Sequence, residues 1–277
     1  MRRVALALAI LLSSIAARGA EPAKPLEVLY VTGGCCHDYD AQKAMITRGM
    51  AARARIRCTV VHEGGTSTNH PISIYEKPDW SKGYDVVFHN ECFSDVKDPK
   101  FLEKILAEHK KGVPAVLMHC AMHCYRAGND EWFKFCGITS PGHGAHYAYT
   151  CKLVGKHPVL AGLPLEWEVP KEELYYSDKV WSTATPLGEA MSTDRNAMQT
   201  CIWTNQYDKT RVFGTTIGHY AETVATPEFL GLVTRGTLWA AGKLQDDGEP
   251  VPALRLTEAE KKAVLDPAPG PQPTPAE

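Results

Sequence analysis

Short apolar runs alternate with amphipathic stretches along the first half of the chain. The runs predict buried strands over residues 27–32, 56–61, 84–89 and 114–118. Between them, apolar residues at helical spacing predict helices over 40–53 and 99–111. Strands that alternate with helices of this length are typical of βαβ units, whose parallel strands are buried on both faces. We therefore expect an α/β fold in which helices cover both faces of a mostly parallel sheet.

The pattern changes after Phe135. Polar and apolar residues alternate over 148–154, 173–176 and 180–185, and Gly and Pro separate these short segments. Such alternation indicates an antiparallel excursion. The chain then returns to a predicted strand at 211–217 and a helix at 227–241, which begins at a proline and is followed by Gly242.

The two ends of the chain have a different composition from the rest. Two arginines, an apolar run and several small residues within 1–20 are typical of a secretory signal peptide, and the run is too short to span a bilayer. We expect removal of 1–20, export to the periplasm or the cell exterior, and no membrane anchor afterwards. One domain is predicted over 26–244. A C-terminal extension over 245–277 would end in a disordered, proline-rich tail.

Charge and cysteine content limit the classes of partner and site. Loss of Arg2, Arg3 and Arg18 with the signal peptide would change the formal net charge from −2 to −5. This argues against nucleic acid or an anionic membrane as a partner and favours a small neutral or cationic ligand. The nine cysteines could form disulfides in an oxidising compartment, but their odd number leaves the pairing open.

Two imidazoles follow buried strands directly. The run 115–118 leads into His119, and the run 212–217 leads into Gly218 and His219. His37 and Asp38 similarly follow the first strand, after Gly33 and Gly34. Because the carboxyl ends of parallel strands line the ligand crevice of an open α/β sheet, we expect these histidines to share one cleft.

Several short motifs, in a fixed order, resemble one family. They are 31–34 with His37-Asp38, the strand ending in His119, 157–164, 173–175, 211–213 with Gly218-His219, Pro227, Phe229, Arg235-Gly236 and 239–242. Over about 26–244 the chain resembles the ThuA-like (trehalose utilisation) family. The resemblance implies the flavodoxin-like fold of the class I glutamine amidotransferases and a link to sugar metabolism.

The amidotransferase relation also implies positions for catalytic groups. That fold places a nucleophilic cysteine on a sharp turn after one strand and a histidine after a later strand. His219 matches the histidine, but His119 stands at the nucleophile's position and Cys120 comes one residue later. The glutamate expected two residues past the histidine is replaced by Ala221. We therefore expect no glutaminase activity.

The histidines at the predicted strand ends could instead hold a metal. Neutral imidazoles that converge with a carboxylate such as Glu173 or Asp38 are ordinary ligands for zinc or a similar divalent ion. We predict metal ligands at His37, His119, His143 and His219, with His146 as an alternative to His143. His119, His219 and Glu173 are the predicted catalytic residues, and no nucleotide cofactor is expected.

The sequence supports three hypotheses of function. The leading one is an enzyme, a hydrolase, lyase or isomerase, for a carbohydrate or keto-sugar, with Asp38, Trp181 and Trp203 as substrate-binding residues. Its imidazoles would hold a divalent metal, or would transfer protons without one. The alternatives are a non-catalytic carbohydrate-binding or assembly module, and a thiol hydrolase that uses Cys120 with His219.

Overall fold

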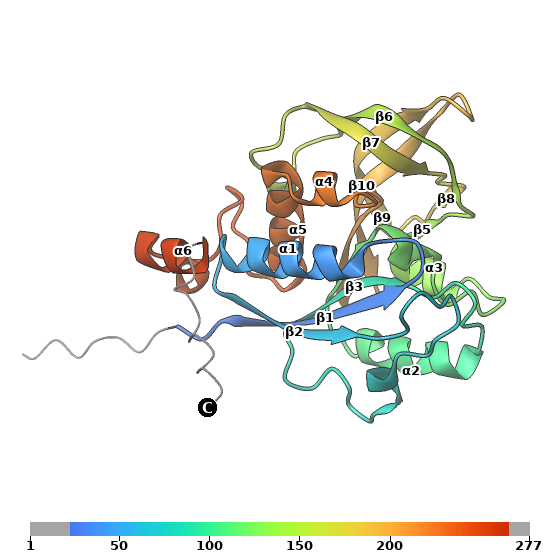
Figure 1. The fold of residues 1–277 in the computed structure, drawn as a ribbon, viewed down its shortest axis with the longest axis horizontal. Coiled ribbons are helices and arrows are strands. Elements are labelled where there is room, and N and C mark those ends of the chain that lie inside the picture. The colour runs from blue at the N-terminus through green and yellow to red at the C-terminus, as the bar shows by residue number, and fades with distance from the viewer. Residues whose placement is uncertain (1–22, 266–277) are drawn as a thin grey trace, which may run out of the picture.

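A mixed sheet of nine strands forms the centre of the computed structural model, which describes residues 23–265 (Figure 1). The predicted signal peptide and the proline-rich tail at 266–277 lie outside the described residues. Within 23–265, no helix combines the length and apolar character needed to cross a membrane.

The sheet joins a parallel half to an antiparallel half. In spatial order its strands are β2 (Ile56–His62), β1 (Leu26–Gly34), β3 (Val86–Cys92), β4 (Ala115–Met118), β11 (Thr210–Thr215), β10 (Ala197–Tyr207), β9 (Ala184–Ser192), β6 (His143–Leu153) and β7 (Glu166–Tyr175). Neighbours from β2 to β11 pair in parallel, and those from β11 to β7 pair antiparallel. The predicted α/β fold with an antiparallel excursion is confirmed, and the excursion extends the same sheet.

In the antiparallel half, β6 begins at His143 rather than at 148, and β7 begins at Glu166 rather than at 173. Two further details differ from the prediction. Residues 180–185 were expected to form one strand, but β8 (Lys179–Val180) pairs with β5 (Ile138–Thr139) in a separate small sheet, and β9 begins only at Ala184. The second difference is β10, which the sequence pattern did not predict. Buried polar residues such as Gln199, Thr200 and Asn205 interrupt its apolar pattern.

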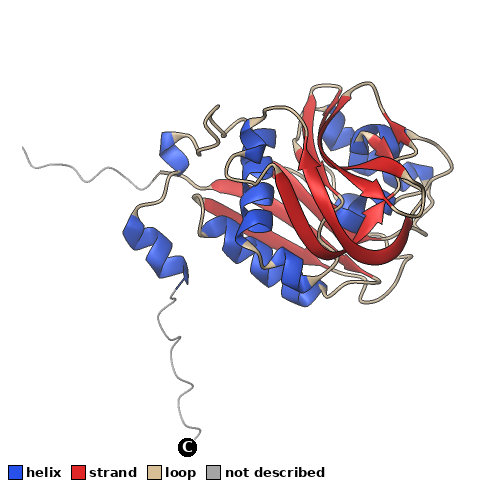
Figure 2. Ribbon diagram, turned by 90° about the horizontal axis from the view of Figure 1, so that it is seen from above, coloured by secondary structure: helices blue, strands red, loops and turns tan. Residues whose placement is uncertain are grey.

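Helices cover both faces of the sheet. They are α1 (Tyr39–Ala51), α2 (Pro99–Lys110), α3 (Glu131–Cys136), α4 (Ala221–Val224), α5 (Pro227–Ala240) and α6 (Glu258–Leu265), with short 3-10 turns η1 (Ser73–Glu76), η2 (His119–His123), η3 (Pro158–Leu160) and η4 (Pro252–Leu254). Figure 1 shows α1 and α2 on opposite sides of β1, and Figure 2 shows helices beside the strongly curved strands.

Alternate residues of β1 supply two separate cores. Val28 packs with Ile46 of α1 and Leu232 of α5 on one face. Leu29 packs with Leu102 of α2 on the other face. The sequence of a strand that is buried on both faces is a continuous apolar run. The parallel strands could therefore be located from sequence.

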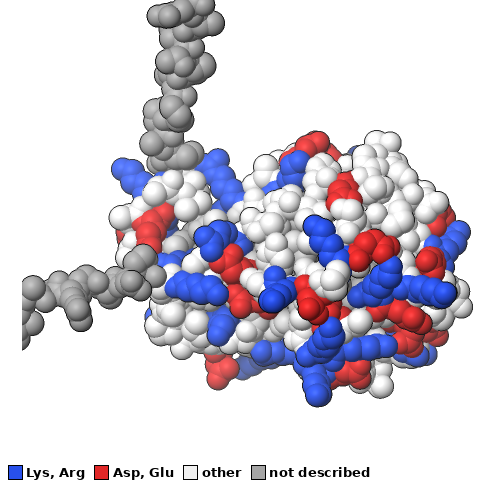
Figure 3. Space-filling view, turned by 90° about the horizontal axis from the view of Figure 1, so that it is seen from below, with Lys and Arg blue, Asp and Glu red and all other residues white. Residues whose placement is uncertain are grey.

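The described part of the C-terminal extension lies against the start of β2. Arg55 donates to both carboxylate oxygens of Glu260 in α6 and to the carbonyl oxygen of Ala253. Figure 3, a view from below, shows basic and acidic side chains interspersed over this side of the molecule. The extension is thus held to the domain by polar contacts.

Candidate functional site

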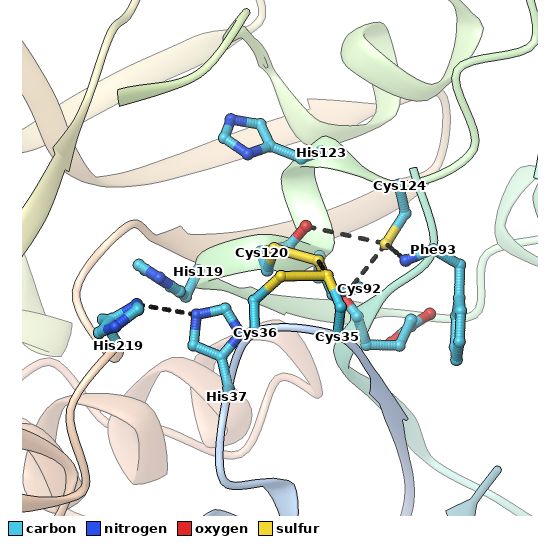
Figure 4. The surroundings of a disulfide bond; sticks show 12 residues. Cys35, Cys36, His37, Cys92, Phe93, His119, Cys120, His123, Cys124 and His219 are labelled. Carbon is cyan, nitrogen blue, oxygen red and sulfur yellow. Dashed lines mark hydrogen bonds between the residues drawn. A yellow bond between two sulfur atoms is a disulfide. The ribbon is translucent and has the colours of Figure 1, made fainter. Parts of the chain in front are cut away.

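Imidazoles from separate parts of the chain meet at the carboxyl ends of the parallel strands. Each contributes one ring nitrogen to a group whose possible ligand atoms all lie within 4.8 Å of one another. We call this group the histidine cluster, and its members are His37, His119, Glu173 and His219. Figure 4 shows His37 and His219 pointing toward each other beside His119. The sheet topology therefore brings together residues from β7 and from the ends of β1, β4 and β11.

His119 is the first residue of η2 and directly follows β4, at a sharp turn of the chain. Its φ of +51° lies in the left-handed region, which is uncommon for residues other than glycine. This strand-to-helix turn presents a side chain at the sheet edge, in the manner of a nucleophile elbow. The ring is 2% exposed and packs on the ring of Tyr175, with 4.6 Å between centroids. The fold thus fixes the imidazole where the amidotransferase comparison placed a nucleophile.

The hydrogen bonds of His119 determine which ring nitrogen is free. Its Nδ1 donates to the carbonyl oxygen of Thr216, because a carbonyl can only accept. In the neutral ring, Nε2 then carries a lone pair, and it lies 3.1 Å from Glu173 Oε2. A lone pair that faces a carboxylate oxygen is unfavourable unless a proton or another cation lies between them. A His that donates its other ring hydrogen to a carbonyl is also the usual arrangement of a metal ligand.

His37 and His219 approach each other directly. His37 Nε2 lies 3.0 Å from His219 Nδ1, and His37 Nδ1 lies 3.1 Å from the hydroxyl of Tyr39. Burial, together with the neighbouring His119 and His219, lowers the pKa of His37 to about 2. His37 is therefore neutral near pH 7, the form in which an imidazole binds a metal.

Glu173 is the carboxylate on which the imidazoles converge. Its side chain is 7% exposed, and its oxygens lie 3.1 Å from His119 Nε2 and 3.2 Å from His219 Nδ1. Burial raises the pKa of Glu173, but its interactions with His119 and His219 lower it by more, so the net shift is downward. The group therefore stays ionised and would attract a cation.

Two further histidines of β6 approach the same carboxylate from its more exposed side. His146 Nε2 lies 2.9 Å and His143 Nε2 lies 3.4 Å from Glu173 Oε1. Both side chains are about one-third exposed. His146 Nδ1 also lies 2.6 Å from the hydroxyl of Tyr220. Of the two residues that the sequence offered as alternatives, His146 is thus the closer to Glu173.

The donor set fits a divalent metal. Zinc binds imidazole nitrogen and carboxylate oxygen at about 2.0–2.2 Å, which requires ligand atoms a few ångströms apart. In the histidine cluster, the measured separations of 3.0, 3.1 and 3.2 Å are close to that requirement. Three imidazoles and one carboxylate, with two histidines nearby, also match the ligand types that zinc and similar ions prefer.

Glu172 holds the turn that carries His219, a role that the sequence analysis missed. Its side chain lies on the other face of β7 from Glu173 and is fully buried. One carboxylate oxygen accepts hydrogen bonds from the backbone N–H groups of Gly218, His219 and Tyr220, at 3.3, 3.0 and 3.3 Å. The sequence held one sign of this role, because Glu172 and Glu173 are adjacent. Side chains of adjacent residues in a strand point to opposite faces of the sheet, so Glu172 could not share the position of Glu173.

The three predicted substrate-binding residues have other contacts. Asp38 is exposed and caps α1, with Oδ1 accepting from Ala41 N at 2.9 Å. Trp181 is half-buried, and the Nζ atom of Lys179 lies 3.4 Å from its ring centroid. Trp203 is fully buried and donates to the Cys136 carbonyl. Because Trp203 has no exposed face on which a sugar could stack, its prediction as a substrate-binding residue is corrected.

Cys120 is not a free thiol in the structure. It forms a disulfide with Cys92 and is 8% exposed. A disulfide sulfur lacks the thiolate on which a cysteine nucleophile depends. The described state therefore does not provide the nucleophile of the Cys120 and His219 thiol hydrolase considered above.

Comparisons with known proteins agree with this fold. The ThuA family model, described as trehalose utilisation, matches residues 27–240. A solved structure described as ThuA-like, from Parabacteroides merdae ATCC 43184, is 20% identical with a TM-score of 0.65, over 86% of this chain and 99% of that one. Another, from Bacteroides uniformis ATCC 8492, is 14% identical with a TM-score of 0.57, over 85% and 98%.

No curated protein gives a significant match. At these identities, the structural likenesses show the fold alone. The family model, however, spans more than half of the chain and covers every strand of the sheet except the first residue of β1. The resemblance inferred from the motifs is thus confirmed, and the protein belongs to the ThuA family.

Proposed function

We propose that this ThuA-family protein is an exported enzyme that acts on a carbohydrate or a keto-sugar through a divalent metal bound in the histidine cluster. The observation that carries the proposal is the lone pair of His119 Nε2, which faces the ionised Glu173 because the Nδ1 hydrogen is donated to Thr216. The family's description as trehalose utilisation supports the choice of a sugar as substrate.

His37, His119, Glu173 and His219 would hold the ion. When bound, a divalent ion there would supply Lewis acidity toward a substrate carbonyl, or a more acidic water. The remaining chemistry belongs to the chain itself. His146 Nε2 faces Glu173 and its Nδ1 faces the Tyr220 hydroxyl on the exposed side, so a substrate proton would reach Nδ1 through that hydroxyl and return by the same route. Glu172 orients the backbone of His219 during this cycle.

A second mechanism uses the same residues without a metal. The neutral His37 lies 3.0 Å from His219, so one ring can donate a hydrogen to the other. A pair of this kind can move a proton next to a carbonyl, as an elimination or an isomerisation requires. The two mechanisms share a substrate class and differ in their need for a metal.

Metal content and activity, measured together, test the proposal. Wild type, Glu173→Gln and the matched control Glu168→Gln, an exposed glutamate of the same strand, are purified and their metal is quantified before and after chelation. We expect roughly one divalent ion per chain in wild type and control, and loss of the ion in Glu173→Gln. Turnover of keto-sugars should fall with the metal. Full turnover in chelator would reject the metal mechanism.

Sugar binding by His119→Ala separates catalysis from a binding module. An enzyme of the proposed kind loses turnover when His119 is removed, even where the sugar still binds. Sugar binding that survives in His119→Ala, with no turnover by wild type on any sugar or keto-sugar, would favour the non-catalytic module.

A further inference from the structure

Four cysteines lie beside the histidine cluster in two disulfides (Figure 4). Cys35 pairs with Cys36 in the turn after β1, and Cys92 at the end of β3 pairs with Cys120 in η2. We call these four residues the sulfur cluster. Cys36 directly precedes His37 and Cys120 directly follows His119. Each disulfide thus adjoins one imidazole of the candidate site.

The two disulfides touch each other. Cys35 Sγ lies 3.7 Å from Cys92 Sγ, which is van der Waals contact between sulfur atoms. Strand β1, which precedes Cys35, pairs in parallel with β3, which ends at Cys92. In this pairing Gly34 lies opposite Cys92. The backbones on both sides are therefore close enough for Cys35 and Cys92 to exchange partners with little movement.

Access from solution differs between the two disulfides. Cys36 is exposed and Cys35 is half-buried, whereas Cys92 is 4% and Cys120 is 8% exposed. An external thiol therefore meets the sulfur of Cys36 before the buried Cys92–Cys120 bond. Exposed disulfides are generally the labile ones.

We propose that the sulfur cluster is a thiol–disulfide exchange site in which two electrons from an external dithiol reduce Cys36 and Cys120 to thiols. One thiolate of the dithiol attacks Cys36 Sγ, the Cys35–Cys36 bond breaks, and Cys35 leaves as a thiolate. Cys35 then attacks Cys92 Sγ, so that a Cys35–Cys92 bond forms and Cys120 leaves as a thiolate, which takes a proton.

The second thiol of the reductant completes the exchange. It attacks its own mixed disulfide with Cys36, which releases Cys36 as a thiol and the reductant as an internal disulfide. One dithiol has then been oxidised, and the sulfur cluster holds one disulfide, Cys35–Cys92, and two thiols, Cys36 and Cys120. The electrons enter at an exposed sulfur and leave a thiol beside His119.

The neighbouring Cys124 does not compete in this exchange. Its Sγ lies 3.7 Å from the carbonyl oxygen of Cys120 and 3.1 Å from that of Glu91. Burial, with the charge of Glu91 as a smaller contribution, raises the pKa of the Cys124 thiol well above its usual range. Cys124 therefore stays in the thiol form. Because only a thiolate attacks a disulfide, Cys124 takes no part in the exchange.

Partial reduction followed by peptide mapping tests the exchange. The oxidised full-length protein receives one equivalent of dithiothreitol, remaining thiols are alkylated, and labelled and cross-linked peptides are identified by mass spectrometry. Beyond the label on cysteines that are already free thiols, we expect new label on Cys36 and Cys120 and a cross-link between Cys35 and Cys92. Label on both Cys35 and Cys36 with the Cys92–Cys120 bond intact would overturn the proposal, as would isolation of the protein with all four cysteines reduced under air.

Two variants separate the relay from direct reduction. In Cys35→Ser the attacking sulfur is absent, so one equivalent of dithiothreitol should leave Cys120 unlabelled. Cys58→Ser, which removes a half-buried free cysteine of β2, should retain the new labels on Cys36 and Cys120. Label on Cys120 in Cys35→Ser would mean that the reductant reaches the buried bond directly and would reject the relay. If Cys35→Ser does not fold, the wild-type cross-link map decides alone.

Discussion

The Nε2 atom of His119 lies 3.1 Å from Glu173 Oε2, while the Nδ1 hydrogen of the same ring is donated to a backbone carbonyl. Two hydrogen-bond acceptors thus face each other in a buried place. Burial makes this contact costly unless positive charge compensates it. A divalent ion or a second proton on His119 satisfies the pair, and the predictions below distinguish these states.

Removing the charge of Glu173 should weaken metal binding more than it weakens the fold. Glu173→Gln preserves the shape of the side chain but replaces one oxygen by an NH₂ group, which cannot bind a metal. Loss of an outer-shell partner typically costs 10- to 100-fold in metal affinity, so we expect a loss of at least about 100-fold for this ligand. Isothermal titration with zinc measures it. Glu168→Gln should bind like wild type, and equal affinities in all three proteins would contradict the assignment.

Glu172 should act on the site through the position of His219. The carboxylate of Glu172 accepts hydrogen bonds from backbone N–H groups of the turn at 218–220. In Glu172→Gln an NH₂ group, which can only donate, takes the place of one carboxylate oxygen. We therefore expect a loss of about 1–3 kcal/mol in the free energy of unfolding. Zinc affinity should fall by about 10- to 100-fold, as for an orienting partner. Urea unfolding and zinc titration give the two values. Reduced stability with unchanged zinc affinity would mean that Glu172 only supports the fold.

Gly218 should be irreplaceable at the turn before His219. Its φ is +136°, and a Cβ atom there would lie 2.4 Å from Cε of Met118. Gly218→Ala should therefore destabilise the protein by about 1–3 kcal/mol and displace His219, with weaker zinc binding. Gly142→Ala is the control, because a Cβ atom there meets nothing within 4 Å and no positive φ is involved. If Gly218→Ala has the same melting temperature and the same zinc affinity as wild type, the requirement for glycine at this turn is refuted.

Stability should fall in mild acid because several histidines, among them the buried His109 and His123, stay neutral in the folded protein. Burial is the main cause that lowers the pKa of His109 and of His123 to about 3, from an ordinary value of 6.5. Below pH 6.5 the unfolded chain takes up these protons and the folded chain does not, so stability is lost as the pH falls from about 6.5 toward 3. Each group contributes up to about 1.4 kcal/mol per pH unit.

Urea midpoints at several values between pH 7.5 and 4 measure this loss. His123→Gln, which removes one of these groups, should reduce the slope of stability against pH below 6.5. A stability that does not change between pH 6.5 and 4 would show that these rings are protonated in the folded state.

The sequence was sufficient to place much of the site along the chain. His37, His119 and His219 each follow a strand of the parallel half, and parallel strands end at one edge of the sheet. Their meeting therefore depends only on the alternation of strands and helices, which the apolar pattern predicts well. His143 and His146 belong to the antiparallel half, and choosing between them needed the register of β6 against β7.

The remaining features depend on distant contacts that a local pattern does not encode. Trp203 was misplaced because polar residues on both sides of it hide a central strand, whereas Glu172 was missed because its role depends on the distant turn at 218–220. The disulfides involve residues from three separate segments of the chain, and the number of cysteines allows too many pairings to choose among.

The local environment of a bound metal tests the central claim most directly. Wild-type protein loaded with one equivalent of zinc is measured by X-ray absorption at the zinc edge. If the histidine cluster holds the ion, the first shell contains nitrogen and oxygen only, at about 2.0–2.2 Å, with the multiple-scattering pattern of several imidazoles. Sulfur in the first shell at about 2.3 Å would place the metal in the sulfur cluster instead, and it would contradict the assignment of His37, His119, Glu173 and His219 as the ligands.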